Sequence, residues 1–228
     1  MTPRGLAAFA LIAIPALAVP LLAATPRQIL TKAAFQSRDK ASALALIDEA
    51  DRGAAALLAR DGSNHEAALV RAMALGYRAK LTRSRRDAVA ARRLFEHFAA
   101  VSPNDADAAA AIGTWHLDSV IALGGFVAGM AIGAKKATGL AMMDRAVALG
   151  GNRALFPGLA ALLRLAIDPA DPRGRALAET ASAAKIVLPI DTIMQRNAAA
   201  LLVPLRAGDR GATQALAKQL LPFGRLKR

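Results

Sequence analysis

The 228-residue sequence contains no cysteine, one tryptophan and one tyrosine. Without cysteine the chain cannot form a disulfide bond, use a thiolate as a nucleophile, or bind zinc or an iron–sulfur cluster through sulfur ligands. Aromatic residues make up only 4% of the sequence, whereas hydrophobic residues, mainly alanine and leucine, make up 55%. This composition is poor in the β-branched and aromatic residues that strands prefer, so it favours helices.

Acidic residues are scarce as well, because 17 Asp and Glu face 30 Lys and Arg, which gives a formal net charge of +13. Such an excess favours anionic surfaces, for example lipid headgroups or acidic proteins. Nucleic-acid binding proteins usually add clustered aromatic residues or a groove-entering motif, and the sequence has neither. We therefore expect no nucleic-acid partner.

Motifs for catalysis, metals and cofactors are also lacking. The three histidines, His65, His97 and His116, show no metal-type spacing. No phosphate-binding glycine loop or dinucleotide fingerprint is present, and no nucleophile with a supporting base is recognisable. We expect no metal, no cofactor and no enzyme activity.

Residues 1–24 have the layout of a secretory signal peptide: a basic start at Arg4, an uncharged apolar middle, and a small-residue end before Thr25. The apolar run of about 20 residues is also just long enough to span a bilayer, so an uncleaved anchor over residues 5–24 is an alternative. A buried helix is a third alternative; two prolines within the run count against both. We expect export to the periplasm or anchoring at the inner membrane, and a separate domain over residues 25–228.

From residue 25 onward, apolar residues recur at helical spacing between short loops rich in Gly, Pro, Asn and Asp. Helices this short are marginal alone and must pair to bury an apolar face. The predicted helices span residues 27–35, 40–60, 64–80, 86–101, 105–120, 138–149, 153–166, 173–185, 191–205 and 212–221. The sequence therefore predicts an all-α fold of paired antiparallel helices.

A repeat motif lies between residues 86 and 165. Ala91, Phe95 and Pro103 stand at the spacings of the second helix and exit turn of a tetratricopeptide repeat, which this segment resembles. Gly113 follows where the next repeat needs a small residue for close packing. Two departures are Phe98, in place of a small residue, and about 14 extra residues inside the next repeat. The resemblance implies helix pairs stacked as a short α-solenoid.

A second resemblance covers the segment AIGTWHLD at 111–118, an apolar insert, and GLAMMDRA at 139–146. Together they are similar to the tetratricopeptide-like region of the regulator of microtubule dynamics family and its bacterial relatives. This implies a helical-repeat interaction protein, although microtubules are not inferred for a chain with a bacterial-looking leader. A weaker similarity to the helical T component of periplasmic TRAP-type transport systems implies a carrier of a small hydrophobic ligand.

Trp115, His116 and Asp118 are the most prominent chemical cluster and lie on one predicted helix. Neighbouring side chains on a helix diverge by about 100°, so Trp115 and His116 are not expected to face each other. The favoured interpretation is structural: Trp115 packs between helices and His116 forms a hydrogen bond near the insert. Contact with a ligand is the alternative, and catalysis has the least support.

The insert, residues 119–134, has 16 uncharged residues, including Phe126 and glycines at 125, 129 and 133. We favour a buried or ligand-covering hairpin. Insertion into a membrane surface and a spanning helix remain alternatives, although about 18–20 residues are needed to span a bilayer.

Basic residues cluster at 83–93, including Arg85 and Arg86, and again at 225–228. They form either a solvated face or a surface that attracts an acidic partner or anionic lipid headgroups.

Two functional hypotheses follow. The first is an exported adaptor that binds a protein or peptide on the concave face of its repeats. The alternative is a periplasmic carrier of a small hydrophobic ligand, with an apolar pocket near residues 115–134. The candidate contact residues for either are Trp115, His116, Asp118, Phe126, Arg85 and Arg86.

Overall fold

The computed structural model describes residues 24–226, and these residues contain eleven α-helices and no β-strand. The predicted all-α class is therefore confirmed. The predicted leader, apart from its last residue, lies outside the described residues. The helices are α1 (Pro26–Gln36), α2 (Lys40–Arg60), α3 (His65–Thr82), α4 (Arg85–Val101), α5 (Ala106–Leu123), α6 (Gly125–Ile132), α7 (Lys136–Leu149), α8 (Leu155–Ile167), α9 (Pro172–Ala183), α10 (Pro189–Arg206) and α11 (Arg210–Leu220).

Side-chain caps explain most of the helix starts. A side-chain oxygen of the residue before the helix accepts a hydrogen bond from a backbone N–H of the first turn, which would otherwise lack a partner. This occurs at Thr25, Asp39, Asn64, Ser84, Asp105, Asp171 and Asp209. Because short polar residues at these positions are visible in the sequence, the predicted helix limits lie close to the observed ones.

The insert differs most from its prediction. Helix α5 continues to Leu123, and a further helix, α6, follows that the sequence analysis did not predict. Gly124 forms the corner between them with φ 79°, and the chain bends by 118° from α5 to α6. None of the described helices is by itself long and apolar enough to cross a membrane. Helices α5 and α6 pass that test only when taken together across this bend.

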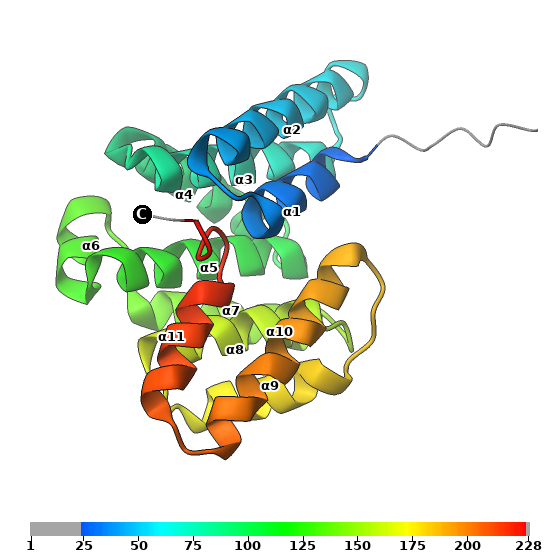
Figure 1. The fold of residues 1–228 in the computed structure, drawn as a ribbon. Coiled ribbons are helices and arrows are strands. Elements are labelled where there is room, and N and C mark those ends of the chain that lie inside the picture. The colour runs from blue at the N-terminus through cyan, green and yellow to red at the C-terminus, as the bar shows by residue number, and fades with distance from the viewer. Residues whose placement is uncertain (1–23, 227–228) are drawn as a thin grey trace, which may run out of the picture.

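Consecutive helices pack against each other, except that α5 pairs with α7 across the protruding α6 (Figure 1). Helices α1, α3, α5 and α8 also contact one another in that order, and α8 contacts both α10 and α11. At Gly113 the α5–α7 contact is so close that a Cβ atom would lie 2.9 Å from Cγ of Met143. The small residue that the repeat motif required is thus at a tight helix crossing, whereas stacking as a solenoid stays a prediction.

Three apolar clusters form the core. One lies among α1, α2 and α3, a second among α3 to α6, and the third among α5 and α7 to α11. The last described residues, Leu221–Leu226, follow α11 without helical structure, and we call them the C-terminal segment. Phe223 belongs to the first cluster and Leu221 to the third, so this segment connects the two halves of the molecule (Figure 1).

Candidate functional site

Trp115 is 8% exposed and belongs to the core cluster that joins α3, α4, α5 and α6. The guanidinium carbon of Arg92 lies 5.8 Å from the centre of the indole ring, which places a cation over the aromatic face. The predicted packing of Trp115 between helices is confirmed. The Trp115 side chain is therefore enclosed by residues of the protein itself.

His116 is 4% exposed, and its Nδ1 accepts a hydrogen bond of 3.2 Å from the backbone N–H of Lys135. The predicted hydrogen bond near the insert is thus confirmed. Burial, followed by the charges of Arg92 and Lys135, lowers the pKa of His116 from 6.5 to about 4. The imidazole is therefore neutral near pH 7 and fixes the chain after α6 onto α5. The expectation that Trp115 and His116 do not face each other is wrong in one respect, because their rings meet edge-on with centroids 5.0 Å apart.

Asp118 is part of a chain of polar contacts that ends on the C-terminal segment. Its Oδ1 lies 2.7 Å from Nζ of Lys80, and the same Nζ donates a hydrogen bond of 2.9 Å to the carbonyl oxygen of Pro222. Lys80 Nζ also lies 5.9 Å from the centre of the Phe223 ring. Asp118 therefore positions a lysine that binds a peptide carbonyl and approaches an aromatic side chain.

The C-terminal segment makes further contacts with α1 and α3. The backbone N–H of Phe223 donates a hydrogen bond of 2.7 Å to the carbonyl of Ala34, at the end of α1. The Phe223 ring packs edge-on against Tyr77 of α3, with centroids 5.1 Å apart. Burial and the charge of Asp118 raise the pKa of Tyr77 to about 12, so its hydroxyl stays protonated. We call Ala34, Tyr77, Lys80 and Asp118 together the segment site.

A pocket of about 260 Å³ adjoins the segment site between α1, α10 and the C-terminal segment. Its lining includes Arg196 and Arg225, with Asn197 and Gln219 as amides and no acidic residue. A buried hydroxyl in this lining, Ser37 Oγ, has no hydrogen-bond partner. The carrier hypothesis instead expected a pocket near residues 115–134, and this pocket contains none of those residues.

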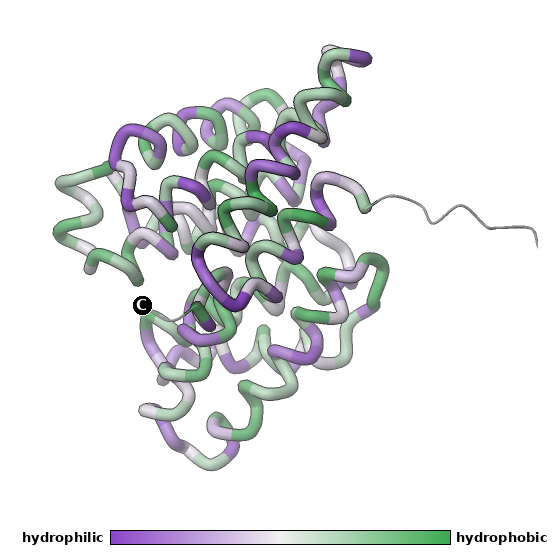
Figure 2. The backbone as a smooth tube through the Cα atoms, turned by 45° about the horizontal axis from the view of Figure 1, so that its top comes forward, coloured by the Kyte–Doolittle hydropathy of each residue, from purple (hydrophilic) through white to green (hydrophobic). Residues whose placement is uncertain are grey.

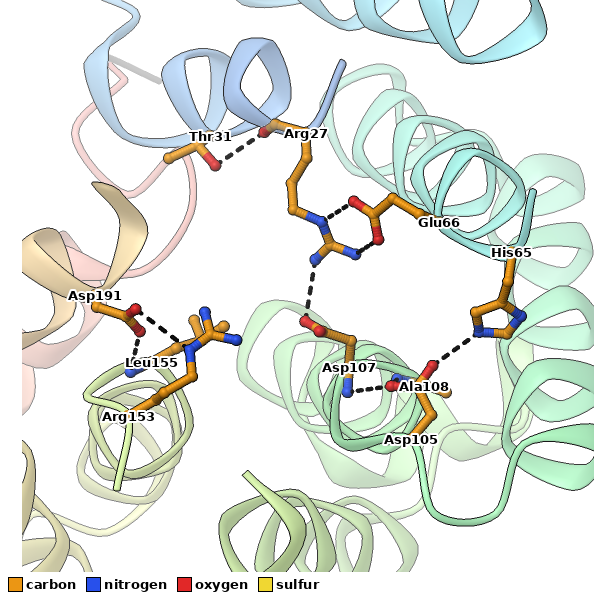
Figure 3. Close-up of polar contacts among 10 residues, drawn as sticks. All are labelled: Arg27, Thr31, His65, Glu66, Asp105, Asp107, Ala108, Arg153, Leu155 and Asp191. Carbon is orange, nitrogen blue, oxygen red and sulfur yellow. Dashed lines mark hydrogen bonds and ion pairs between the residues drawn. The ribbon is translucent and has the colours of Figure 1, made fainter. Parts of the chain in front are cut away.

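A separate polar network joins the starts of α1, α3 and α5 (Figure 3). The guanidinium of Arg27 forms hydrogen bonds to both carboxylate oxygens of Glu66 and one of 3.0 Å to Asp107. Burial alone would lower the pKa of Arg27, but these two carboxylates outweigh it and raise the pKa. Beside them, His65 Nε2 lies 2.8 Å from Asp105. Because these groups are mutually paired, we interpret the network as a link between the alternate helices α1, α3 and α5.

Asp191 forms a similar link between α8 and α10. It is fully buried, and its two oxygens accept hydrogen bonds from the backbone N–H groups of Leu155, Val187 and Leu188, with Arg153 at 3.3 Å. Figure 3 shows the contacts with Leu155 and Arg153. A buried carboxylate with this many donors is satisfied as a structural group. Among the described residues, no group of His, Asp and Glu is arranged to hold a metal ion.

The remaining predicted contact residues lie on or beside α6. Arg85 Nε donates a hydrogen bond of 2.7 Å to the carbonyl of Ala131, so this arginine binds the end of α6. The side chain of Arg86 is 91% exposed, with Asp87 at 3.2 Å. Phe126 is 82% exposed. The predicted burial of the insert is therefore wrong for the outer face of α6, which no other helix of residues 24–226 covers.

Of the segment site, sequence reasoning named only Asp118 as a candidate contact residue and missed the other three residues. The available signal was the sequence LPFGRL, which places Leu, Phe and Leu among Pro, Gly and Arg after the last helix. Comparisons with protein-family models, with curated proteins and with solved structures gave no match.

Proposed function

We propose that this chain is a helical-repeat adaptor that binds a short, turn-forming segment of a partner protein at the segment site, in exchange for its own C-terminal segment. The observation that carries the proposal is that this site already binds a short peptide segment, the chain's own C-terminal segment. The segment site offers a carbonyl acceptor on Ala34, a cation for a peptide carbonyl on Lys80, and an aromatic face on Tyr77. These three groups suit any segment that resembles the chain's own.

The chemistry of the site describes the partner segment. It needs an aromatic residue for the place of Phe223, and a preceding carbonyl that Lys80 can reach, as Pro222 provides. Asp118 keeps Lys80 oriented, which lowers the cost of ordering that side chain when the partner binds. A basic residue after the aromatic one, as in Arg225, would remain in solvent.

A competition experiment tests the proposal. A fluorescent peptide with the sequence of residues 217–226 is titrated into the full chain and into a Phe223→Ala variant, whose own segment is loosened. We expect saturable binding to the variant that is about ten-fold tighter than to the native chain, because the native segment no longer competes fully for the site. A ten-fold difference in affinity corresponds to about 1.4 kcal/mol. A peptide with Ala at the Phe223 position should not bind.

Matched lysine variants show whether the peptide uses the same contacts. In the Phe223→Ala background, Lys80→Met should weaken peptide binding about ten-fold or more, because a hydrogen bond to a charged group contributes about 1.5–3 kcal/mol. Lys40→Met, at an exposed position of α2, serves as the control and should change nothing. If Phe223→Ala keeps its helical circular-dichroism spectrum but binds no peptide, the segment site is closed core and the adaptor proposal is wrong.

We also propose that the adaptor works in the cell envelope. This rests on the pattern of residues 1–24, because Arg4 and the apolar run resemble an export signal. A reporter fused after Arg27 should be active outside the cytoplasm, and N-terminal sequencing should start near Thr25. Recovery of intact Met1 from the membrane fraction would instead favour the anchor.

A further inference from the structure

Helix α6 presents a continuous apolar face to solvent. Three of its residues, Phe126, Val127 and Met130, stand at positions i, i+1 and i+4 of the helix, and Leu123, the last residue of α5, lies across the corner at Gly124. Their exposed fractions are 46% for Leu123, 82% for Phe126, 51% for Val127 and 75% for Met130. Figure 2 shows α6 protruding from the body of the molecule, largely in the green of hydrophobic residues. We call these four residues the α6 face.

The opposite side of α6 is held firmly by α4. Ala128 and Ile132 are buried in the core cluster that contains Trp115. Arg85 and Arg92 donate hydrogen bonds to the last carbonyls of α6, those of Ala131 and Ile132. These carbonyls would otherwise lack partners at the helix end. The helix is therefore fixed in a position that displays its apolar face.

Basic side chains are numerous on the segments next to α6 in the chain and in α4, which contacts it. Exposed arginines come from the turn before α4 and from α4 itself, and two exposed lysines follow α6 directly; they are Arg83, Arg85, Arg86, Arg93, Lys135 and Lys136. Acidic residues near them are few: Asp87 pairs with Arg86, and Glu96 pairs with Arg92. An apolar face beside a cluster of positive charges is complementary to a lipid bilayer, in which an apolar interior lies beneath anionic headgroups.

We infer that the α6 face inserts into the interface of a bilayer that carries anionic headgroups. The four apolar side chains enter the boundary between headgroups and acyl chains, and the surrounding arginines and lysines bind the headgroup phosphates. A second copy of this chain fits less well, because it would bring an identical cluster of positive charge. This inference is independent of the peptide-binding proposal, since α6 takes no part in the segment site.

The absence of cysteine from the sequence allows a site-specific test on the full chain. A Met130→Cys variant is labelled with an environment-sensitive fluorophore, and Val203→Cys is the matched control, because Val203 is 69% exposed in α10, away from α6. The vesicles contain about two parts phosphatidylcholine to one part phosphatidylglycerol, or phosphatidylcholine alone. A shift of the emission to shorter wavelength at residue 130 only, and only with the anionic vesicles, is the expected result. The residue 203 probe also accounts for any membrane contact made by the N-terminal residues.

Charge variants provide the second readout. Arg86→Gln and Arg93→Gln should each lower the affinity for anionic vesicles, measured with the probe at residue 130, about five-fold. This corresponds to about 1 kcal/mol per basic residue at an anionic surface. Added salt should reduce it as well. An equal shift at residues 130 and 203, a response to neutral vesicles that the charge variants leave unchanged, or no response at residue 130 would each overturn the inference. A concentration-dependent shift without vesicles would overturn it too, in favour of self-association.

Discussion

Two short segments of this chain, α6 and the C-terminal segment, each follow directly after a helix, and their phenylalanines lie in opposite environments. In α6, Phe126 is 82% exposed, whereas Phe223 of the C-terminal segment is 8% exposed. Both phenylalanines stand next to a glycine, so local sequence does not explain the difference. Their hydrophobicity is the same, and something other than hydrophobicity decides which one is buried.

The backbone supplies an explanation. Helical hydrogen bonds satisfy the N–H groups of α6 beyond its first turn, and two arginines bind its final carbonyls, so little of its backbone needs an outside partner. The C-terminal segment is not helical, and the N–H of Phe223 finds its acceptor on Ala34. A segment whose backbone needs outside partners is drawn onto the body of the protein, and its apolar side chains are buried with it.

The largest expected effect is the contrast between the two phenylalanines. Phe223→Ala should lower the free energy of unfolding by about 3–5 kcal/mol, the usual range for a buried phenylalanine, because its ring joins the core cluster of α1 to α3. Phe126→Ala should change it by less than about 0.5 kcal/mol, as is usual for an exposed site. Urea unfolding of both variants measures the difference. Equal losses would mean that α6 is covered in solution.

The second effect depends on pH and concerns only the α6 side. The folded-state pKa of His116 is about 4, below the ordinary 6.5, so the unfolded chain binds this proton first. The contribution of neutral His116 is complete above pH 6.5 and is lost as the pH falls from 6.5 towards 4. By pH 4 the loss should be about 2–3 kcal/mol, since one pKa unit corresponds to about 1.4 kcal/mol.

His116→Gln is the matched control for this pH dependence. The glutamine amide oxygen can accept the hydrogen bond from Lys135 N–H, but it does not titrate in this range. Unfolding free energies measured between pH 7 and pH 4 should fall more steeply for the native chain than for the variant. Parallel profiles would show that His116 does not remain neutral in the folded state.

The third effect tests the corner that points α6 outward. Gly124 has φ 79° and open space around its Cα, so Gly124→Ala meets only backbone strain and should cost about 1–2 kcal/mol. Gly125→Ala is the neighbouring control, with open space and helical backbone, and should stabilise by up to about 1 kcal/mol. Thermal or urea unfolding would decide; losses of equal size would mean that side-chain space, not the backbone, limits this corner.

Most of the helical framework could be predicted because its signals are local. Cap residues such as Asp39 and Asn64 lie next to the helix starts that they stabilise, and the helix Lys40–Arg60 was predicted with the observed limits. The structural roles of Trp115 and His116 were likewise predictable. A large aromatic residue among apolar neighbours on a helix is usually packed, and a lone histidine usually needs only one partner.

The two apolar segments could not be predicted, for different physical reasons. Every residue of α6 is apolar or glycine, so no polar face reveals a helical period or indicates which side is exposed. The burial of Phe223 depends on Ala34 and Tyr77, which lie about 150 or more positions earlier in the chain. Contacts this distant leave no pattern within a short window of sequence. The contact of Arg85 could not be predicted for the same reason, because its acceptor, the carbonyl of Ala131, lies in another helix.

The smallest expected effect separates Arg85 from its neighbour Arg86. Arg85→Gln removes a hydrogen bond to the end of α6 and should cost about 1 kcal/mol of unfolding free energy. Arg86→Gln removes an exposed ion pair with Asp87 and should cost less than about 0.5 kcal/mol. Both variants lose one positive charge beside the α6 face, so both should bind anionic vesicles about five-fold more weakly. If vesicle binding instead falls only for Arg85→Gln, the position of α6 matters and the surrounding charge does not, because the two variants differ in their contact with α6 and not in their charge.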